Sequence, residues 1–495
     1  MVGRVVALLA SMTAHSYQPR QPEKTLLYEI IQSHLQGFLS RCELAGRYFP
    51  RFVESEFNAF SQCGVLAYGF ARFECKACRY NHVVAFSCKR RGFCPSCGGR
   101  RMTERAAHLV DSVLPYAPVR QWVLSLPIQI RYLIAYDAEL CSEILNALIR
   151  EVFRWYRRFA KEYAGLESMS EARCGSVTFI QRAGSSLNLN VHFHMLALDG
   201  VYAHQGWGQP LVFHALPSPS DAEVQEVVGR VRKRIVEVLE IHGHGSGSSE
   251  VSDDLALREP LLAACVAGAL SNRVGTGPNA GSRTRLLRSA ELSREVRRVR
   301  SSRCAAVDHY SLHANTRVSA GARKKLEKLC RYVARPPLSN ELLVDRPDGR
   351  IAYQLKRPWR DGTTAVVFKP LELIERLVPL IPPPRTHQVR YHGVLASGSS
   401  LLSFVVHRGS ARKPTSQSRN YCWAELMARA FDIDVLVCPR CSGPMRLVAT
   451  IMERDVIRAI LGSMGLPADS PPLAPAKPSP QTDFEFEGDM GWHST

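Results

Sequence analysis

Three Cys-x-x-Cys pairs constrain this chain more than any other feature of its sequence. They are Cys75/Cys78, Cys94/Cys97 and Cys438/Cys441, and they belong to a total of 15 cysteines in 495 residues. In a large chain this spacing is typical of metal binding in a reducing compartment, whereas disulfide frameworks occur in small secreted domains. The pairs therefore predict metal-ligating turns rather than a disulfide scaffold.

The first two pairs lie close together and predict a structural zinc site. A Cys-x-x-Cys turn presents two thiolates from one tight knuckle, and two such turns can close a tetrahedron around Zn²⁺ with no open position. The predicted ligands are Cys75, Cys78, Cys94 and Cys97, with Cys63, His82 and Cys88 also within reach. A buried set of reduced cysteines is the alternative. Because the third pair has no partner pair nearby, it is interpreted as either half a metal site or a plain turn.

The net charge of the chain indicates a polyanionic partner. Lys and Arg number 64 against 45 Asp and Glu, which gives +19 with neutral histidine. Nucleic acid is the usual partner for such an excess, and an anionic membrane surface is the competing one. No run of about 20 predominantly apolar, uncharged residues occurs, so we expect no membrane insertion.

Hydrophobic periodicity mixes helical and strand-like segments, as expected for an α+β protein. The segment 350–406 is interpreted as strand-rich, and 242–249 as a flexible connection. Predicted helices are 24–62, 138–163, 221–240, 260–270 and 321–335, and predicted strands are Val119–Leu126, Ser176–Gln181 and Asn190–Leu198.

The last of these strands carries two histidines, His192 and His194. Strand side chains alternate between faces, so both imidazoles project on one face, about 7 Å apart along the strand. Two imidazoles in this arrangement can converge on one divalent metal, although ordinary surface or core histidines are the commoner explanation of such a pair. Gln181, at the end of the preceding strand, is the nearest candidate for a third ligand.

The basic helix near 321–335 carries Tyr332 outside its apolar stripe and stops before a Pro-Pro pair. The residue before a proline is pushed out of the α region, so the helix ends close to the tyrosine. Lys325, Lys328 and Arg335 share its side of the helix. Neighbouring cations favour the ionised phenol and can hold a phosphate, as a tyrosine that attacks a phosphodiester requires. A structural tyrosine is the alternative.

Several motifs in this order resemble the rolling-circle transposases of the IS91 family, which belong to the HUH endonuclease superfamily. The resemblance covers roughly residues 40–465. The matching segments are the cysteine cluster, Gln181–His194, Leu329–Pro337, Leu355–Gly362, Val389–Gly393 and Cys438–Cys441.

The resemblance implies an HUH fold, an antiparallel sheet flanked by helices, with Mg²⁺ or Mn²⁺ on His192 and His194. It also implies that Tyr332 cleaves one DNA strand and stays joined to its 5′-phosphate. The best-known members have two tyrosines separated by three residues, but the position four before Tyr332 is Lys328. The chain therefore resembles the single-tyrosine common-region branch most closely, and Lys328 is predicted to hold the scissile phosphate.

Contacts to DNA are predicted beside the second knuckle, in the arginine-dense segment 283–300 and on the tyrosine helix. The alternative for these residues is a solvated cationic face. The predicted DNA-binding residues are Arg90, Arg91, Arg297, Arg298, Lys325 and Arg335.

The predicted organisation has an N-terminal zinc-binding domain, an HUH domain and a small C-terminal module. The predicted boundaries are 1–40 for an N-terminal extension, 41–115 for the zinc-binding domain, 116–345 for the HUH nuclease domain with a flexible insert near 242–250, 346–430 for a strand-rich region, 431–465 for the Cys-x-x-Cys module and 466–495 for a disordered tail.

The function predicted from these features is a DNA transposase that cuts and rejoins single strands at insertion-sequence ends. It would use structural Zn²⁺ and catalytic Mg²⁺ or Mn²⁺, bind chiefly single-stranded DNA, and work in the bacterial cytoplasm near the nucleoid. A non-catalytic zinc-ribbon DNA-binding regulator is the main alternative, since it needs the cysteines and the charge but no histidine pair or cationic tyrosine. A hydrolase that activates water at the two histidines is a third possibility.

Overall fold

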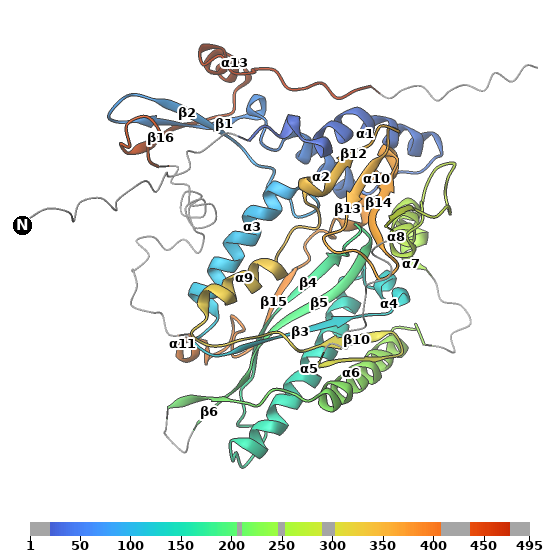
Figure 1. Cartoon of the computed structure of the whole chain (residues 1–495), viewed down its shortest axis with the longest axis vertical. Coiled ribbons are helices and arrows are strands. Elements are labelled where there is room, and N and C mark those ends of the chain that lie inside the picture. The colour runs from blue at the N-terminus through green and yellow to red at the C-terminus, as the bar shows by residue number, and fades with distance from the viewer. Residues whose placement is uncertain (1–19, 205–209, 246–252, 290–301, 407–435, 476–495) are drawn as a thin grey trace, which may run out of the picture.

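The computed structural model describes residues 20–204, 210–245, 253–289, 302–406 and 436–475. Its centre is a seven-stranded sheet in the order β15-β4-β5-β3-β10-β9, with β11 also paired to β3 (Figure 1). Every pairing in it is antiparallel, which confirms the predicted α+β class. The strands are β3 (Val119–Ser125), β4 (Gly175–Ala183), β5 (Leu189–Leu198), β9 (Cys304–Val307), β10 (Tyr310–His313), β11 (Arg317–Val318) and β15 (Val389–Gly393).

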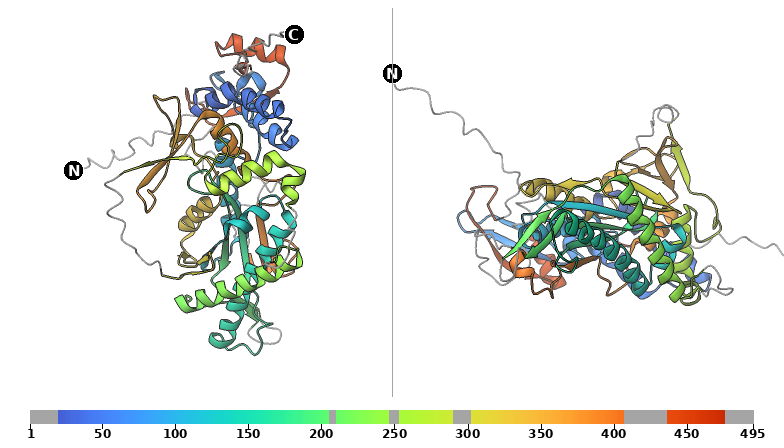
Figure 2. Two further views of the ribbon diagram at one scale, coloured as in Figure 1. Left: turned by 90° about the vertical axis from the view of Figure 1, so that its right-hand side faces the viewer. Right: turned by 90° about the horizontal axis from the view of Figure 1, so that it is seen from below.

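Helices α5 (Ala138–Tyr163) and α6 (Asp221–Ile241) cover one face of this sheet (Figure 2). Trp122 of β3 contacts the rings of Trp155 and Tyr156 on α5, with ring centroids 5.7 and 6.2 Å apart. Asp137 caps α5 by accepting the first free backbone N–H groups of the helix. Both helices begin and end within one residue of the predicted ranges.

A buried ion pair lies between the sheet and these helices. Arg120 and Asp199, both wholly buried, form a two-pronged salt bridge with N···O distances of 2.7 and 2.9 Å. The Tyr156 hydroxyl and Arg317 also bind the Asp199 carboxylate. A buried charge requires this degree of pairing, so the network fixes how β3 and the end of β5 meet.

Helices α9 (Arg323–Val333) and α3 (Pro95–His108) run side by side over the opposite face (Figure 1). The apolar stripe of α9 is the predicted one, and it packs on Val177, Phe179 and Leu196 of the sheet. A single π-helical turn at Leu109–Val113 continues α3 into β3. The stripe residues are Leu326, Leu329, Cys330 and Val333.

The two ends of the chain meet in a separate three-stranded sheet, at the upper left of Figure 1. Its order is β16-β1-β2, so a strand near residue 450 pairs with one near residue 70. The N-terminal helices α1 and α2 precede it, and α13 packs on it. The elements are α1 (Leu26–Leu44), α2 (Arg51–Gln62), β1 (Phe70–Cys75), β2 (Asn81–Ala85), β16 (Met445–Ile451) and α13 (Arg454–Ser463).

The region predicted to be strand-rich contributes to two different sheets. Its strands β13 (Ile351–Gln354) and β14 (Thr363–Phe368) form a four-stranded sheet with β12 (Leu343–Asp345) and β8 (Arg285–Arg288), while β15 adds to the edge of the central sheet. Gly393 ends β15 with a φ of +62°, and a Cβ there would lie 2.0 Å from the Cys174 carbonyl oxygen. Only glycine therefore fits at this junction.

The remaining elements surround the central sheet. They are β6 (Gly200–His204), β7 (Leu211–Ala215), β8 (Arg285–Arg288), β12 (Leu343–Asp345), β13 (Ile351–Gln354), β14 (Thr363–Phe368), α4 (Ile128–Leu133), α7 (Asp254–Arg258), α8 (Pro260–Ser271), α10 (Pro370–Leu377) and α11 (Leu402–Val405), with short 3-10 turns at Pro22–Lys24, Leu66–Tyr68, Asn340–Leu342 and Val378–Leu380.

Candidate active site and zinc centre

A cavity of about 560 Å³ lies over the sheet face that carries α9. Alternate residues of β3 and β5 form its floor, because strand side chains two apart share a face. The end of α9 forms one wall, and the connection between β10 and β11 forms another. The lining residues are Gln121, Val123, Ser125, Asn190, His192, His194, His313, Asn315, Thr316, Leu329, Tyr332 and Arg335.

The two histidines lie together on the floor of this cavity, only 8% and 5% exposed. Their ring centroids are 4.8 Å apart, closer than the strand repeat, because the rings turn toward one another. Nδ1 of His192 donates a hydrogen bond to the Asn190 carbonyl at 2.7 Å, which leaves Nε2 as its metal-binding atom. The side-chain amide nitrogen of Gln121 donates a hydrogen bond of 2.7 Å to Nδ1 of His194, which fixes the orientation of this second ring.

Both imidazoles are neutral at pH 7. Burial lowers the pKa of His192 to about 4. Burial, together with the charge of His192, lowers the pKa of His194 to about 3. Neutral imidazole is the form that binds a metal, so the pair fits a divalent cation.

The predicted third ligand, Gln181, lies beside the pair but points elsewhere. The register of β4 and β5 places it directly opposite His192. Its amide, however, donates a hydrogen bond to the Val333 carbonyl at the end of α9, and Gln181 does not line the cavity. In the described part of the chain, no third His, Cys, Asp or Glu completes a metal group with the two histidines.

Asn190 lines the cavity and has an unused ligand atom. It precedes His192 by two residues on β5, so all three side chains share one face. Its Oδ1 is buried and accepts no hydrogen bond from the described residues. Such an oxygen requires a partner, and a hard divalent cation is a suitable one. The Asn-x-His-x-His spacing carried this signal in the sequence, but the prediction used only the histidines.

Tyr332 reaches the same cavity from α9, about 140 residues further along the chain. Its ring is perpendicular to that of His194, with centroids 6.1 Å apart, and half of its surface is exposed. The Arg335 guanidinium stacks over the tyrosine ring at 4.7 Å. The structure therefore brings together the two sequence motifs that were predicted separately.

Helix α9 is anchored at both ends. Arg323, its first residue, donates hydrogen bonds to the carbonyls of Pro115 and Leu114 at 3.0 and 2.9 Å. At the other end, Gln181 holds the Val333 carbonyl. The position of Tyr332, one residue before the end of the helix, is thus fixed from two sides.

The other residues predicted around the tyrosine lie further from the cavity. Lys328 and Lys325 are exposed on α9 and do not line it. Tyr310 and Tyr353, the other nearby tyrosines, are buried elsewhere in the core.

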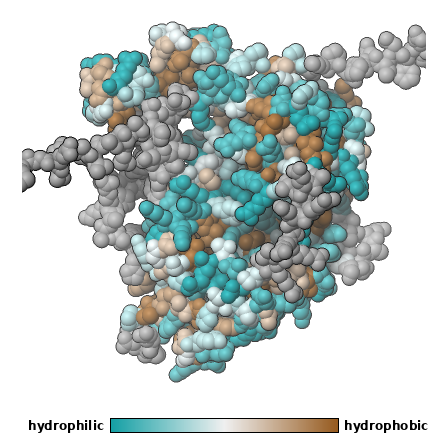
Figure 3. Space-filling model, in the orientation of Figure 1, coloured by the Kyte–Doolittle hydropathy of each residue, from teal (hydrophilic) through white to brown (hydrophobic). Residues whose placement is uncertain are grey.

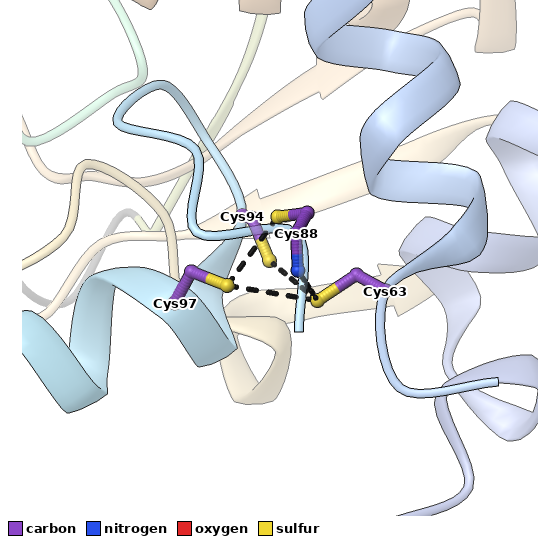
Figure 4. Close-up of side chains that lie close together, drawn as sticks. All are labelled: Cys63, Cys88, Cys94 and Cys97. Carbon is purple, nitrogen blue, oxygen red and sulfur yellow. Dashed lines mark hydrogen bonds between the residues drawn. The ribbon is translucent and has the colours of Figure 1, made fainter. Parts of the chain in front are cut away.

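Four cysteines form a tight group at the junction of α2, β2 and α3 (Figure 4). The sulfurs of Cys63, Cys88, Cys94 and Cys97 all lie within 4.8 Å of one another. Neighbouring sulfurs are 3.3 to 3.7 Å apart, close to the edge of a tetrahedron around zinc with Zn–S bonds of about 2.3 Å. Hydrogen bonds, the first from Cys63, hold the pKa of the Cys97 thiol well below its usual range, which favours a thiolate ligand.

The prediction that the first two Cys-x-x-Cys pairs share one zinc is wrong. Cys94 and Cys97 pair with Cys63 and Cys88, whereas Cys75 and Cys78 lie with Cys438 and Cys441 in a second group. The physical reason is the β1–β2 hairpin, which carries the first pair to its tip, away from α3. Cys88, predicted as a ligand within reach, belongs to the first group; His82 belongs to neither.

Two family models match the chain. One, described as "Transposase zinc-binding domain", matches residues 30–126. The other, described as "Putative transposase", matches residues 175–401. The chain belongs to the IS91 family of transposases. No curated protein and no solved structure matches it.

The two matched segments of the transposase divide the candidate sites between them. The zinc-binding segment contains the group formed by Cys63, Cys88, Cys94 and Cys97, so structural zinc is the natural occupant of that group. The second segment contains His192, His194 and Tyr332. Cys438 and Cys441 lie outside both. No helix among the described residues of the transposase is long and apolar enough to cross a membrane.

A close packing contact connects the zinc group to the tyrosine helix of the transposase. Gly98 follows the ligand Cys97 on α3, and a Cβ there would lie 2.5 Å from the Cβ of Pro336. Pro336 is three residues beyond the end of α9. The proline ring thus sits directly on the backbone of α3, one residue from the zinc ligand.

An arginine-lined hollow of about 70 Å³ adjoins the cavity of the transposase. Arg335 lines both spaces. None of the arginines of the hollow forms an ion pair in the described part of the chain. Burial, followed by the charge of Arg101, lowers the pKa of Arg105 to about 10, as expected where cations crowd without counter-charge. The arginines are Arg91, Arg101, Arg105, Arg182 and Arg335.

The predicted DNA-binding residues of the transposase are scattered relative to this hollow. Arg91 and Arg335 line it, and Arg90 lies near it on the surface, bonded to Ser55. Figure 3 shows hydrophilic and hydrophobic residues interspersed over the face of the molecule that Figure 1 presents. Arg297 and Arg298 lie outside the described residues. The DNA-binding residues predicted from the sequence did not include Arg101, Arg105 or Arg182, which also line the hollow.

Proposed function

We propose that this transposase cuts one DNA strand with Tyr332 and holds the cut end as a 5′-phosphotyrosine during rolling-circle transposition. The observation that carries the proposal is the shared cavity of His192, His194 and Tyr332. Two weak sequence signals, far apart in the chain, meet where the ring centroids of His194 and Tyr332 lie 6.1 Å apart. A regulator that only binds DNA has no need of this arrangement.

The ligands proposed for a catalytic Mg²⁺ or Mn²⁺ are His192, His194 and Asn190. The free Nε2 of His192, the neutral state of both imidazoles and the unpartnered Oδ1 of Asn190 support this set. A bound cation would polarise the scissile phosphate and stabilise the charge of the transition state.

The side chains of the transposase would supply the nucleophile and would position the DNA strand. The Tyr332 hydroxyl attacks the phosphorus and loses its proton, and the 3′ oxygen of the preceding nucleotide leaves and takes up a proton. The energy of the broken phosphodiester is kept in the phosphotyrosine, so the reverse attack by a 3′-hydroxyl rejoins the strand without ATP. Because Lys328 occupies the place of a second tyrosine, the proposal assigns both cleavage and rejoining to one nucleophile, with Lys328 near the phosphate.

The arginines beside the cavity, which have no acidic partner among the described residues, are the proposed path of the DNA backbone. Arg335 contacts both the tyrosine ring and the hollow, so a strand held there by its phosphates would lead directly to Tyr332. Guanidinium groups without acidic partners bind phosphate strongly because no internal ion pair has to be broken. The proposed substrate is single-stranded DNA at the ends of the element.

Incubation with labelled single strands that carry the element's ends tests the nucleophile. The wild type should form a covalent protein–DNA adduct, and mass spectrometry should place it on Tyr332. Tyr332→Phe keeps the ring and its packing but should form none. Tyr163→Phe, at an exposed tyrosine on α5, is the matched control and should react normally. Free cleaved DNA without an adduct would indicate a hydrolase, and a mobility shift alone a regulator.

Substitution of the metal ligands tests the cation site. His194→Ala should slow cleavage by at least about 100-fold while DNA binding persists, because phosphate contacts supply the affinity. Asn190→Ala should raise the Mg²⁺ concentration needed for half-maximal cleavage, whereas Gln181→Ala should not. If Gln181→Ala raised the required Mg²⁺ concentration and Asn190→Ala did not, the third metal ligand would be Gln181.

A further inference from the structure

The second cysteine group lies at the tip of the sheet that joins the two ends of the chain. The sulfurs of Cys75, Cys78, Cys438 and Cys441 all lie within 4.8 Å of one another. Each sulfur of the first pair contacts one of the second: Cys75 with Cys441 and Cys78 with Cys438, both at 3.5 Å. These contacts are much longer than a disulfide bond and match the sulfur–sulfur edges of a tetrahedral metal site.

The two knuckles have the same backbone geometry although about 360 residues separate them. In the first, the Cys75 N–H donates to the Tyr80 carbonyl at 2.8 Å, and the Arg79 N–H donates to the Cys75 carbonyl at 3.0 Å. In the second, the Cys438 N–H donates to the Gly443 carbonyl at 2.8 Å, and the Ser442 N–H donates to the Cys438 carbonyl at 2.9 Å.

The two knuckles also share the backbone conformation of the residue that follows the second cysteine. Arg79 has a φ of +61° and Ser442 one of +57°, a left-handed conformation that is unfavourable for both residue types. The two turns therefore share this unusual conformation at the same position relative to their cysteines. A shared task, the presentation of two thiolates to one ion, explains both.

The space around the sulfurs is shaped for a metal rather than for packed thiols. Gly443 lies against the group, and a Cβ there would be 3.2 Å from the Cys441 sulfur and 3.3 Å from the Cys75 sulfur. The Arg440 N–H points at the Cys438 sulfur at 3.4 Å, as a donor to a thiolate would. Four sulfur ligands without other donors select zinc over magnesium or calcium.

The rest of the module holds the knuckles in register independently of the main core. Strand β16 pairs with β1 from Cys75↔Met445 to Phe70↔Ile451. Beneath them, a small separate core buries Phe70, Val83, Ile457 and Leu461. Variants of the second group should therefore leave the central sheet folded.

From these observations we propose that Cys75, Cys78, Cys438 and Cys441 bind a second structural zinc, which closes a ribbon made from both ends of the chain. The site is distinct from the one in the matched zinc-binding segment, since half of its ligands lie outside that segment. It does not depend on the proposed cleavage chemistry. The module is a metal clasp: the C-terminal strand and α13 are held to the N-terminal hairpin by shared ligands.

Zinc content of the full-length protein tests the clasp. Elemental analysis should find two zinc ions per wild-type chain and one per chain of the Cys438→Ser/Cys441→Ser double variant. Cys304→Ser, a partly exposed cysteine outside both groups, should keep two. One zinc in both the wild type and the double variant would overturn the proposal, as would iron in place of zinc.

Thiol labelling provides a second readout that does not depend on yield. Cys78 and Cys441 are exposed, so as free thiols they would react rapidly with iodoacetamide. Bound to zinc, they should be protected in the native protein and become reactive after a chelator is added. Rapid labelling of both before chelation, or an intact mass lower by two hydrogens per cysteine pair, would show free thiols or disulfides and refute the clasp.

Discussion

The two cysteine groups use the same kind of turn but occupy opposite situations in the molecule. The group of Cys63, Cys88, Cys94 and Cys97 comes from 35 consecutive residues, is largely buried, and lies one residue from the contact with Pro336. The other group joins residues from both ends of the chain, has two exposed members, and sits on a small module with its own core. The comparison shows that the effect of a metal site on the rest of the protein depends on the elements that pack against it. The spacing of the cysteines in the sequence does not reveal these neighbours.

The largest expected effect is a loss of stability when a cysteine of the buried group is replaced. Cys94→Ser removes a ligand that is 3% exposed and leaves an unpaired hydroxyl among three thiols. Loss of a structural metal should lower the free energy of unfolding by about 4 kcal/mol or more, because metal binding is coupled to folding. Zinc content, soluble yield and urea unfolding measure it, with the equally buried Cys141→Ser as control. An unchanged unfolding midpoint in Cys94→Ser would contradict the prediction that the buried group contributes more to stability than the exposed group.

A smaller effect is expected where the buried group meets the tyrosine helix. Gly98→Ala places a methyl group 2.5 Å from Pro336, so α3 or the end of α9 has to shift, while Gly99→Ala has open space. Displacement of a nucleophile by about 1 Å can cost 100-fold in rate, and we expect a loss of 10- to 100-fold. Adduct formation at full zinc content should fall in Gly98→Ala only. Equal rates in the two variants would show that the contact does not position Tyr332.

The arginine hollow between this group and the cavity should show an effect on binding rather than stability. Arg105→Ala removes one unpaired cation, which should weaken single-stranded DNA binding about 10-fold and reduce the slope of log K against log salt by about 1. Arg150→Ala, on α5 across the sheet, is the control. Fluorescence anisotropy over a range of salt concentrations measures both quantities. An effect of the same size in Arg150→Ala would indicate a general charge effect.

The smallest effect is expected at the exposed group. Cys441→Ser should lose one zinc but keep cleavage within about twofold of the wild type, because the clasp shares no core with the cavity. Adduct yield and zinc content, measured on the same sample, check this. A loss of cleavage comparable to that of Cys94→Ser would mean that the module acts on the active site.

Regular elements with strong periodicity were predictable from the sequence. Helix 138–163 and the strand with the two histidines were predicted almost to the residue, because one face of each is apolar over its full length. The histidine pair and Tyr332 could be proposed as site residues because their local context carries the chemistry. That they share a cavity followed only from the resemblance, since the pairing of distant elements leaves no local periodicity.

The ligand sets were predicted less well for the same reason. Strand β1 ends at Cys75, and the turn that follows it points away from α3. Nothing in the nearby sequence shows that β1 pairs with a strand near residue 450. Gln181 was placed correctly beside His192, yet its amide is used by the backbone of α9. Which of two neighbouring polar side chains faces a cavity is decided by packing from another part of the chain.

The pairing of β1 with β16 also has a consequence for the order in which the protein acquires its metals. The ribosome adds about 5 to 20 residues per second, so some 360 residues between Cys78 and Cys438 take roughly 20 to 70 s to synthesise. Throughout that interval the only other cysteine knuckle in the nascent chain near Cys75 and Cys78 is that of Cys94 and Cys97. Cys63, Cys88, Cys94 and Cys97 are all present as soon as Cys97 has been synthesised, so the buried group can be completed early, whereas Cys75 and Cys78 have to wait for Cys438 and Cys441.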